Sequence, residues 1–173
     1  MLRFPRQLQR YDSAADCCDR LAQRLETHLR QWLSMPLALR RPLGLATGRT
    51  MEPLYAALVQ RLRLWSAQDL DELRRRWSSF NLDEYLGLPA GDPCRYSTYM
   101  RRHLGEPLQL RSETLHLPNG SAADADGAAQ SYATELDACG GVGVQLLGLG
   151  NNGHVGFNEP LTTADQVCHV VDL

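Results

Sequence analysis

The chain has 173 residues, which suffice for one domain with a buried core, and its 43% hydrophobic and 22% charged content is that of an ordinary globular protein. A net charge of -2 gives no footprint for nucleic acid or an anionic membrane, and all 18 basic residues are arginine, which excludes a Schiff-base lysine. Five cysteines without a Cys-x-x-Cys pair, no signal peptide and no apolar membrane span predict a cytoplasmic protein with reduced thiols.

The predicted elements alternate between helices and short apolar strands. Ser13 can cap a first helix with an apolar stripe on one face, and Thr50 and Pro53 open a second one. Helical patterns continue at 67–76, 94–104 and 124–138. We predict strands at 42–46, 77–82, 113–117 and 143–149, the last with the clearest pattern, and 167–171 is a further candidate.

This alternation is typical of the α/β class, in which a mostly parallel sheet is covered by helices on both faces. No internal repeat or linker is visible, so we predict a single domain over residues 1–173. Ligands collect at the carboxyl ends of parallel strands. A polar segment follows each of the four strands there, which predicts an active site: ATGRT (46–50), LDEY (82–85), PNG (118–120) and GNNGH (150–154).

The loop TGRT stands where a strand ends and a helix begins. Gly48 lets the backbone approach a ligand closely, and exposed amides at a helix start favour an anion such as phosphate. Thr47 and Thr50 add hydroxyl donors, and Arg49 adds a positive charge. The loop lacks the Gly-Lys-Thr of a Walker loop and the dinucleotide fingerprint. A simple capped turn is the alternative.

The acidic pair Asp83 and Glu84 follows the second predicted strand. Adjacent residues at a strand end point to opposite sides, so one carboxylate is expected to face the crevice at the sheet edge. The alternative is that either residue only caps the following turn.

His154 and Glu159 are separated by a glycine-containing bend that can fold them together. A carboxylate within hydrogen-bond reach orients an imidazole and raises its basicity, which suits a proton relay to a substrate hydroxyl. No second His or Cys lies at metal-ligand spacing, so we expect no metal site there. A structural histidine is the alternative, and it is the role we expect for His28, His103 and His116.

Five segments together resemble the glucosamine-6-phosphate deaminase/isomerase family, whose superfamily also contains the 6-phosphogluconolactonases. The likeness runs from about residue 13 to the end of the chain. It implies a modified Rossmann-like fold, a small sugar phosphate as substrate and no cofactor. It also makes a homo-oligomer one possible state of assembly. The segments are LATGRTMEPLY (45–55), FNLDEYLGLP (80–89), YMRRHL (99–104), LHLPNGSAAD (115–124) and LLGLGNNGHVGFNEP (146–160).

The resemblance also implies roles for single residues. Residues 47–50 would hold the 6-phosphate of the sugar, with Glu84 in the same substrate-binding set. Asp83 looks like the base that moves a proton between C2 and C1 during aldose–ketose isomerisation with ammonia release. His154, supported by Glu159, looks like the group that handles the proton of the ring oxygen.

Two departures from the family pattern affect this interpretation. Asn152, which we place in the catalytic set, stands where the glucosamine enzymes usually carry Asp, and an amide stabilises an imidazolium less than a carboxylate does. The Asn form, followed by CHVVDL (168–173), looks more like the galactosamine-6-phosphate isomerase branch and favours that substrate. The family domain also continues through a mobile lid and further strand–helix units, so the chain resembles its N-terminal part.

Lactone hydrolysis and an inactive sugar-phosphate-binding module are the alternative functions.

Overall fold

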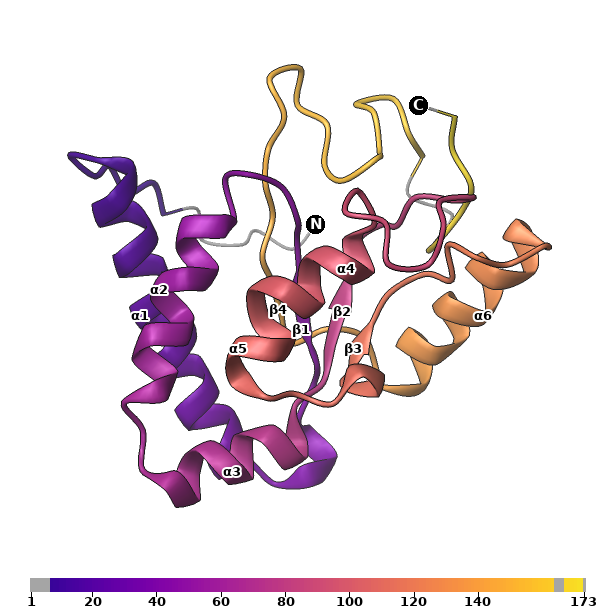
Figure 1. Ribbon diagram of the computed structural model, residues 1–173. Helices are drawn as coiled ribbons and strands as arrows, with labels where there is room; N and C mark the ends of the chain where they lie inside the picture. Colours follow the sequence, from indigo (N-terminus) through magenta and orange to yellow (C-terminus); the bar gives the residue numbers. More distant parts are fainter. Residues whose placement is uncertain (1–6, 164–166, 173) are drawn as a thin grey trace.

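A parallel sheet forms the centre of the protein, whose computed structural model describes residues 7–163 and 167–172 (Figure 1). In these ranges the sheet has four strands in the order β3-β2-β1-β4, and every neighbouring pair is parallel. The α/β class with a parallel sheet is therefore confirmed. The strands are β1 (Leu43–Leu45), β2 (Ser79–Asn81), β3 (Leu115–His116) and β4 (Val144–Gln145).

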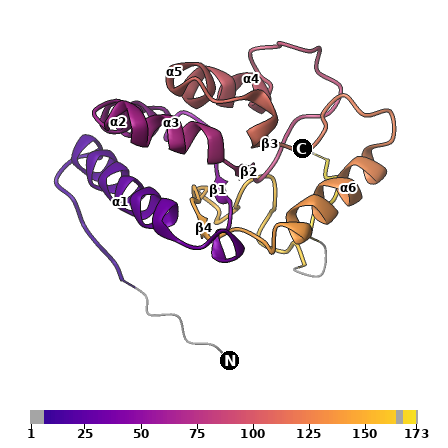
Figure 2. The same cartoon turned by 90° about the horizontal axis from the view of Figure 1, so that it is seen from below.

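Helices cover both faces of this sheet, as the sequence predicts (Figure 2). One face carries α1 to α5, and α6 lies against the other face. A π-helical turn (Arg101–Gly105) joins α4 to α5, and short 3-10 turns span Leu37–Leu39 and Ser112–Thr114. The helices are α1 (Ala14–Ser34), α2 (Glu52–Arg63), α3 (Ala67–Arg76), α4 (Tyr96–Met100), α5 (Glu106–Leu108) and α6 (Ala125–Ala138). In the described part of the chain, no helix has both the length and the apolar character that a membrane crossing requires.

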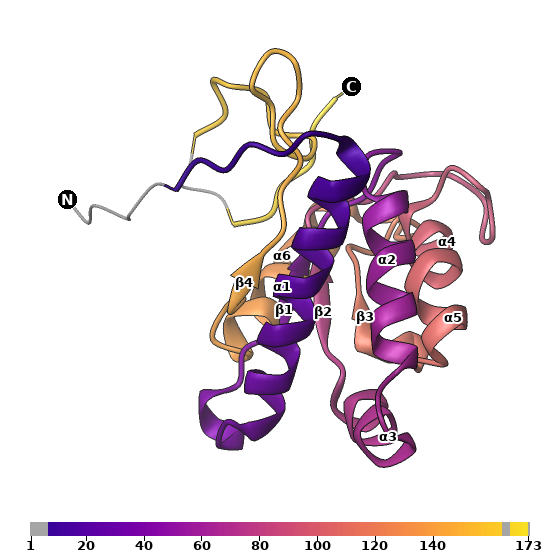
Figure 3. The ribbon, with the colours of Figure 1, turned by 90° about the vertical axis from the view of Figure 1, so that its left-hand side faces the viewer.

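The strand order reverses between β1 and β4. The chain passes from β1 to β2 and β3 through the helices on one face, then crosses through α6 on the other face to β4, beside β1. In open parallel sheets ligands bind outside the carboxyl ends of the strands at such a reversal. The segments that follow β1, β2 and β4 lie together at that end of the molecule, above the sheet in Figure 1 and Figure 3.

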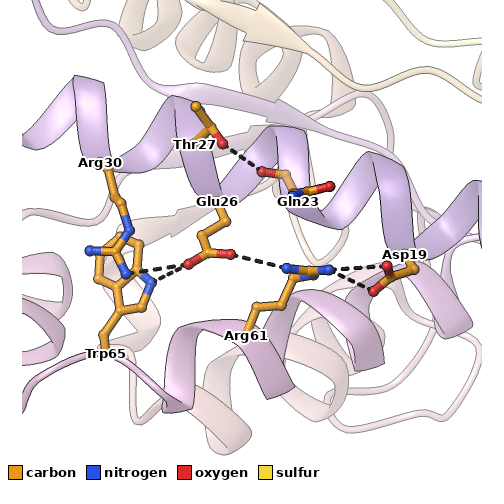
Figure 4. Close-up of polar contacts among 7 residues, drawn as sticks. All are labelled: Asp19, Gln23, Glu26, Thr27, Arg30, Arg61 and Trp65. Carbon is orange, nitrogen blue, oxygen red and sulfur yellow. Dashed lines mark hydrogen bonds and ion pairs between the residues drawn. The ribbon is translucent and has the colours of Figure 1, made fainter.

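Helix α2, which begins directly after the TGRT loop, is held in place by α1. Their interface is apolar at its centre. Polar side chains from both helices make further contacts at its margin (Figure 4). The Glu26 carboxylate accepts from Trp65 Nε1 at 2.8 Å, from Arg30 at 3.3 Å and from Arg61 at 3.4 Å. Asp19 binds the same Arg61 guanidinium through both oxygens, at 2.9 and 3.0 Å. The buried core residues of these two helices are Ala22, Leu25, Leu29, Leu54, Tyr55, Leu58, Val59 and Leu62.

Most predicted elements are present, but the strands are shorter than expected. Ser13 caps α1 by accepting from the backbone N–H of Asp16 at 3.0 Å. The prediction of a strand over 143–149 is wrong beyond Gln145. Leu146 donates a last ladder bond to Gly44, and because β1 ends at Leu45, the residues that follow have no neighbouring strand to pair with.

Three other boundaries differ. Residues 167–171 form irregular chain instead of a strand. The predicted helix over 94–104 starts at Tyr96 and continues through the π turn to Leu108. Helix α2 starts at Glu52 with Met51 as its cap, so Thr50 lies in the preceding turn.

We predict that Glu26→Gln lowers the free energy of unfolding by about 1 kcal/mol at neutral pH, because the amide loses the charge that pairs with two arginines. Burial alone would raise the pKa of Glu26, but the hydrogen bonds from Trp65, Arg30 and Arg61 outweigh it and lower this pKa. Such a group stabilises the fold above its unfolded pKa of about 4.3, and the contribution is lost as the pH falls through the folded pKa. In urea unfolding, the difference in the free energy of unfolding between Glu26→Gln and the unchanged chain is therefore largest at neutral pH and shrinks in acid.

Glu113→Gln is the matched control. Its side chain is 65% exposed and pairs only at the surface with Arg111, so we expect a loss below about 0.5 kcal/mol. A loss for Glu26→Gln that is no larger, or that persists unchanged in acid, contradicts the role given to Glu26.

Candidate active site

Three segments meet at the carboxyl ends of the strands. The Tyr99 hydroxyl from α4 donates to the Gly48 carbonyl in the loop after β1, at 2.9 Å. Gly148, after β4, faces the Met51 side chain at the start of α2. Gly156 lies so close to the Asp83 carboxylate that a Cβ on this glycine would stand 2.8 Å from Oδ2. The segments that carry the predicted phosphate loop, Asp83 and His154 are therefore packed against one another.

Asp83 lies two residues after the end of β2, in a partly buried position. Burial, together with the neighbouring charge of Glu84, raises the pKa of Asp83 to about 6, although the backbone N–H of Phe157 donates to the carboxylate and works in the opposite direction. An acid with a pKa near neutrality can both take up and return a proton under physiological conditions.

Glu84, the next residue in the chain, lies against the start of α4. Its side chain is 0% exposed. The carboxylate accepts from the backbone N–H groups of Tyr85 and Tyr96, at 2.9 and 2.8 Å, and of Ser97 at 2.9 Å. Arg95 Nε lies 3.7 Å away. These contacts occupy both oxygens, so Glu84 holds the start of α4 against the end of β2 and offers no free oxygen to a ligand, contrary to its expected place in the substrate-binding set.

His154, Asn152 and Glu159 form a chain of side-chain contacts. Asn152 Nδ2 donates to Glu159 at 2.7 Å, and Asn152 Oδ1 lies 2.8 Å from His154 Nδ1. Glu159 was expected to contact His154 directly, but the amide of Asn152 stands between them.

This chain of contacts selects the tautomer of His154. The Glu159 carboxylate only accepts hydrogen bonds, so the Asn152 amide must turn its NH2 group toward Glu159 and its oxygen toward the imidazole. The neutral imidazole then carries its proton on Nδ1, and Nε2 is left as the basic nitrogen.

Gly150 leaves room for the His154 imidazole because it has no side chain. A Cβ on Gly150 would stand 2.2 to 2.4 Å from three atoms of the His154 ring, so the ring lies directly over this glycine. The backbone N–H of Gly150 donates to the His154 carbonyl at 2.9 Å and closes the turn. Gly153 has a φ of +92°, which favours glycine at the bend.

The loop after β1 presents free donors. In the described residues, the backbone N–H groups of Thr47, Gly48, Arg49 and Thr50 donate no hydrogen bond, and the Arg49 guanidinium makes no ion pair. Gly48 has a φ of +108°, and Arg49 and Thr50 are exposed. The loop therefore offers unpartnered amides and one positive charge to an anion.

An aromatic cluster that the sequence analysis missed joins these segments. Tyr85, Tyr96 and Phe157 have ring centroids 4.9 to 5.6 Å apart. Tyr96 also hydrogen-bonds Thr47, and its pKa is raised by burial, by Tyr85 and by the charge of Asp83. Nothing in the spacing of these three residues predicts their contact, since they come from the segment after β2, the start of α4 and the turn after β4.

A cavity of about 780 Å³ lies on one side of Asp83. Its walls include Asp83, Phe157, the first half of α6 and residues 167–172, but neither the loop at 47–50 nor His154. Glu84 and Glu159, two other residues of the predicted site, also line this cavity. In the described residues, no cluster of three or more His, Cys, Asp or Glu side chains could hold a metal ion.

Comparison with known proteins relates the chain to one family. Residues 12–157 match the family model described as glucosamine-6-phosphate isomerases/6-phosphogluconolactonase. The glucosamine-6-phosphate deaminase of Lysinibacillus sphaericus is 41% identical over 131 residues, which cover 76% of this chain and 53% of that protein. That of Staphylococcus aureus is 44% identical over 132 residues, or 76% of this chain and 50% of that protein. The chain thus spans about half the length of these relatives.

Solved structures agree in fold. A monomeric glucosamine-6-phosphate deaminase superposes with a TM-score of 0.74 and 32% identity, covering 87% of this chain and 58% of that one. A 6-phosphogluconolactonase from Thermotoga maritima gives a TM-score of 0.66 at 20% identity, over 81% and 59% of the two chains. At this lower identity the likeness shows the fold alone.

We predict that Asp83→Asn raises the free energy of unfolding by about 2 kcal/mol at neutral pH, since the amide imitates the protonated carboxyl. The folded pKa of Asp83, about 6, lies above the unfolded value, so the folded chain binds the extra proton between the two. The free energy of unfolding of the unchanged chain therefore falls as the pH rises between the unfolded and the folded pKa of Asp83. Asp83→Asn cannot ionise at this position, so its stability does not fall for this reason. Urea unfolding at a series of pH values measures it; the same difference at about pH 4 as at neutral pH would show that Asp83 is not perturbed.

We predict that Gly150→Ala displaces the His154 ring while the chain stays folded, because the new methyl group meets only the mobile end of a side chain. The ring then loses Asn152, and the share of the Nδ1–H tautomer falls. Nitrogen-15 NMR of the ring at about pH 9, where an ordinary imidazole is neutral, reports this share. Gly148→Ala is the control, since its Cβ would meet only Met51, at 3.3 Å. Unchanged ring shifts in Gly150→Ala would contradict the placement of His154.

Proposed function

Because the chain belongs to the glucosamine-6-phosphate isomerase/6-phosphogluconolactonase family, we propose that it carries the proton-transfer part of an active site that isomerises and deaminates an aminosugar 6-phosphate. The observation that supports this most directly is the position of Asp83, a carboxyl with a pKa of about 6 packed against the turn that presents His154. The reaction takes up water and yields a ketose phosphate and ammonia.

The phosphate of the substrate would be held by the loop after β1. Its amides at residues 47–50 have no partner among the described residues and stand at the start of α2, where the helix dipole favours an anion. The hydroxyl of Thr50 and the charge of Arg49 would add to this attraction. Because every basic residue of the chain is arginine, no lysine competes for this role.

Asp83 would transfer the proton between two adjacent carbons of the open-chain sugar. The base takes a proton from C2 and returns it to C1, so it must be ionised when the substrate arrives and a good acid one step later. A pKa of about 6 meets both conditions near neutral pH. No metal or organic cofactor is needed for this exchange.

His154 would open the sugar ring before this step. With its proton held on Nδ1 by Asn152, Nε2 is free to take the proton of the C1 hydroxyl and pass one to the ring oxygen. Asn152 and Glu159 would act by fixing the orientation of the ring. Glu84 would act more remotely, since its carboxylate is committed to the backbone of α4.

The sugar itself is the finer part of the proposal. The relatives that match three quarters of the chain are named glucosamine-6-phosphate deaminases, which favours glucosamine 6-phosphate. Asn152, in contrast, is the residue type expected in the galactosamine-6-phosphate branch, and the preference for galactosamine 6-phosphate stays a prediction. A cytoplasmic location and a homo-oligomer also stay predictions, and the related structure of a monomeric deaminase makes a single chain an equal expectation.

The test is ammonia release by the purified chain from glucosamine 6-phosphate and galactosamine 6-phosphate, with 6-phosphogluconolactone hydrolysis measured alongside. We expect ammonia from one of the two amino sugars and no lactone hydrolysis. Asp83→Asn is expected to lower turnover by a factor of about 10² to 10⁴, because a general base is lost, while sugar-phosphate binding persists.

Asp69→Asn removes an exposed carboxylate on α3, far from the site, and is expected to leave turnover unchanged. Lactone hydrolysis without ammonia release would reassign the chain to the lactonases. Binding of the sugar phosphate without any turnover would contradict the enzymatic proposal and leave a binding module.

A further inference from the structure

Two tyrosines, Tyr55, which is buried, and Tyr99, which is partly buried, hold the backbone of the loop after β1. The Tyr55 hydroxyl, from α2, donates to the Ala46 carbonyl, and the Tyr99 hydroxyl, from α4, donates to the Gly48 carbonyl at 2.9 Å. Their rings pack edge to face with centroids 6.3 Å apart. The loop therefore has one side fastened to the helices and one side open.

Because the peptide bond is planar and trans, these two hydrogen bonds also determine where the N–H groups of the loop point. In such a peptide the C=O of one residue and the N–H of the next point in opposite directions. When the Ala46 and Gly48 carbonyls turn inward to the tyrosines, the N–H groups of Thr47 and Arg49 turn outward, to the open side. Neither N–H donates a hydrogen bond within the described residues.

We propose that Tyr55 and Tyr99 are positioning residues that aim the N–H groups of Thr47 and Arg49 at the phosphate of the substrate. This inference rests on the proposed function, in which the loop binds that phosphate. The tyrosines do not touch the ligand; they prevent the loop from turning its carbonyl oxygens, which repel an anion, toward the open side.

Gly48 makes such control necessary. Its φ of +108° and the open space around it allow the peptide between residues 48 and 49 to rotate with little steric resistance. The Tyr99 hydroxyl and the backbone N–H of Met51, which both donate to the Gly48 carbonyl, select one orientation of this peptide. Burial raises the pKa of both tyrosines far above their ordinary value, so both stay protonated and able to donate at any working pH.

The two carbonyls depend on their tyrosines to different extents. Gly48 also accepts from the backbone N–H of Met51 at 2.9 Å, and keeps this bond when the Tyr99 hydroxyl is removed. In the described residues, the Ala46 carbonyl has the Tyr55 hydroxyl as its only partner outside the strand ladder. We therefore expect Tyr55→Phe to weaken phosphate binding more than Tyr99→Phe does.

The experiment measures the dissociation constant for inorganic phosphate by calorimetry or NMR titration. Tyr55→Phe is expected to raise it about tenfold and Tyr99→Phe about threefold, because each removes one hydrogen bond that orders the donors. Tyr132→Phe is the matched control. The Tyr132 hydroxyl is also buried and donates to a strand-end carbonyl, that of Asn81, at 2.6 Å, but outside the phosphate loop. This variant is expected to lose comparable stability without a change in phosphate binding.

The order of the loop gives a second readout that needs no ligand. Nitrogen-15 relaxation is expected to show lower order parameters at Gly48 and Arg49 in Tyr99→Phe and at Thr47 in Tyr55→Phe, and no change at these residues in Tyr132→Phe. If the three variants weaken phosphate binding equally, or the loop keeps its order without the hydroxyls, the inference fails. If the unchanged chain does not bind phosphate, the proposed function fails, and the relaxation data still decide whether the tyrosines orient the loop.

Discussion

The site depends on one buried carboxylate, that of Glu84. Three backbone N–H groups, two of them at the start of α4, donate to it, and its side chain is completely enclosed. Hydrogen bonds to a buried carboxylate are among the strongest in proteins, so this contact fixes α4 to the end of β2. Since α4 carries Tyr96 and Tyr99, which reach the loop after β1, Glu84 indirectly sets the distance between Asp83 and the proposed phosphate loop. The neighbouring charge also contributes to the raised pKa of Asp83.

Close approaches that only glycine permits complete the arrangement. Gly156 lets the turn after β4 press against Asp83, and Gly150 lets the His154 imidazole lie on the backbone of the same turn. Two chemically different groups, a carboxyl near neutral pKa and an imidazole with its Nε2 free, are thereby brought to one sheet edge. The parallel sheet supplies this edge because its strand order reverses between β1 and β4.

The sequence predicted the fold class, the first helix with its Ser13 cap and the clustering of polar segments at the strand ends, because each follows from local pattern and chain order. It overestimated the strand after Gly143, because pairing depends on a neighbour that a local pattern cannot reveal. It also could not place Asn152 between His154 and Glu159, or commit Glu84 to α4, since both outcomes depend on how separate turns pack. The contacts of the Tyr55 and Tyr99 hydroxyls and the cavity beside Asp83 could not be predicted from the sequence for the same reason.

The central claim is that Asp83, His154 and the amides around Gly48 serve one sugar phosphate. NMR titration of the chain with glucosamine 6-phosphate tests it most directly, with signals from the Gly48 and Arg49 amides, the His154 ring and the Asp83 carboxyl followed together. The account predicts that all of them respond with a single dissociation constant. Responses confined to one of these groups, or different dissociation constants for the loop and for Asp83, would contradict a shared site.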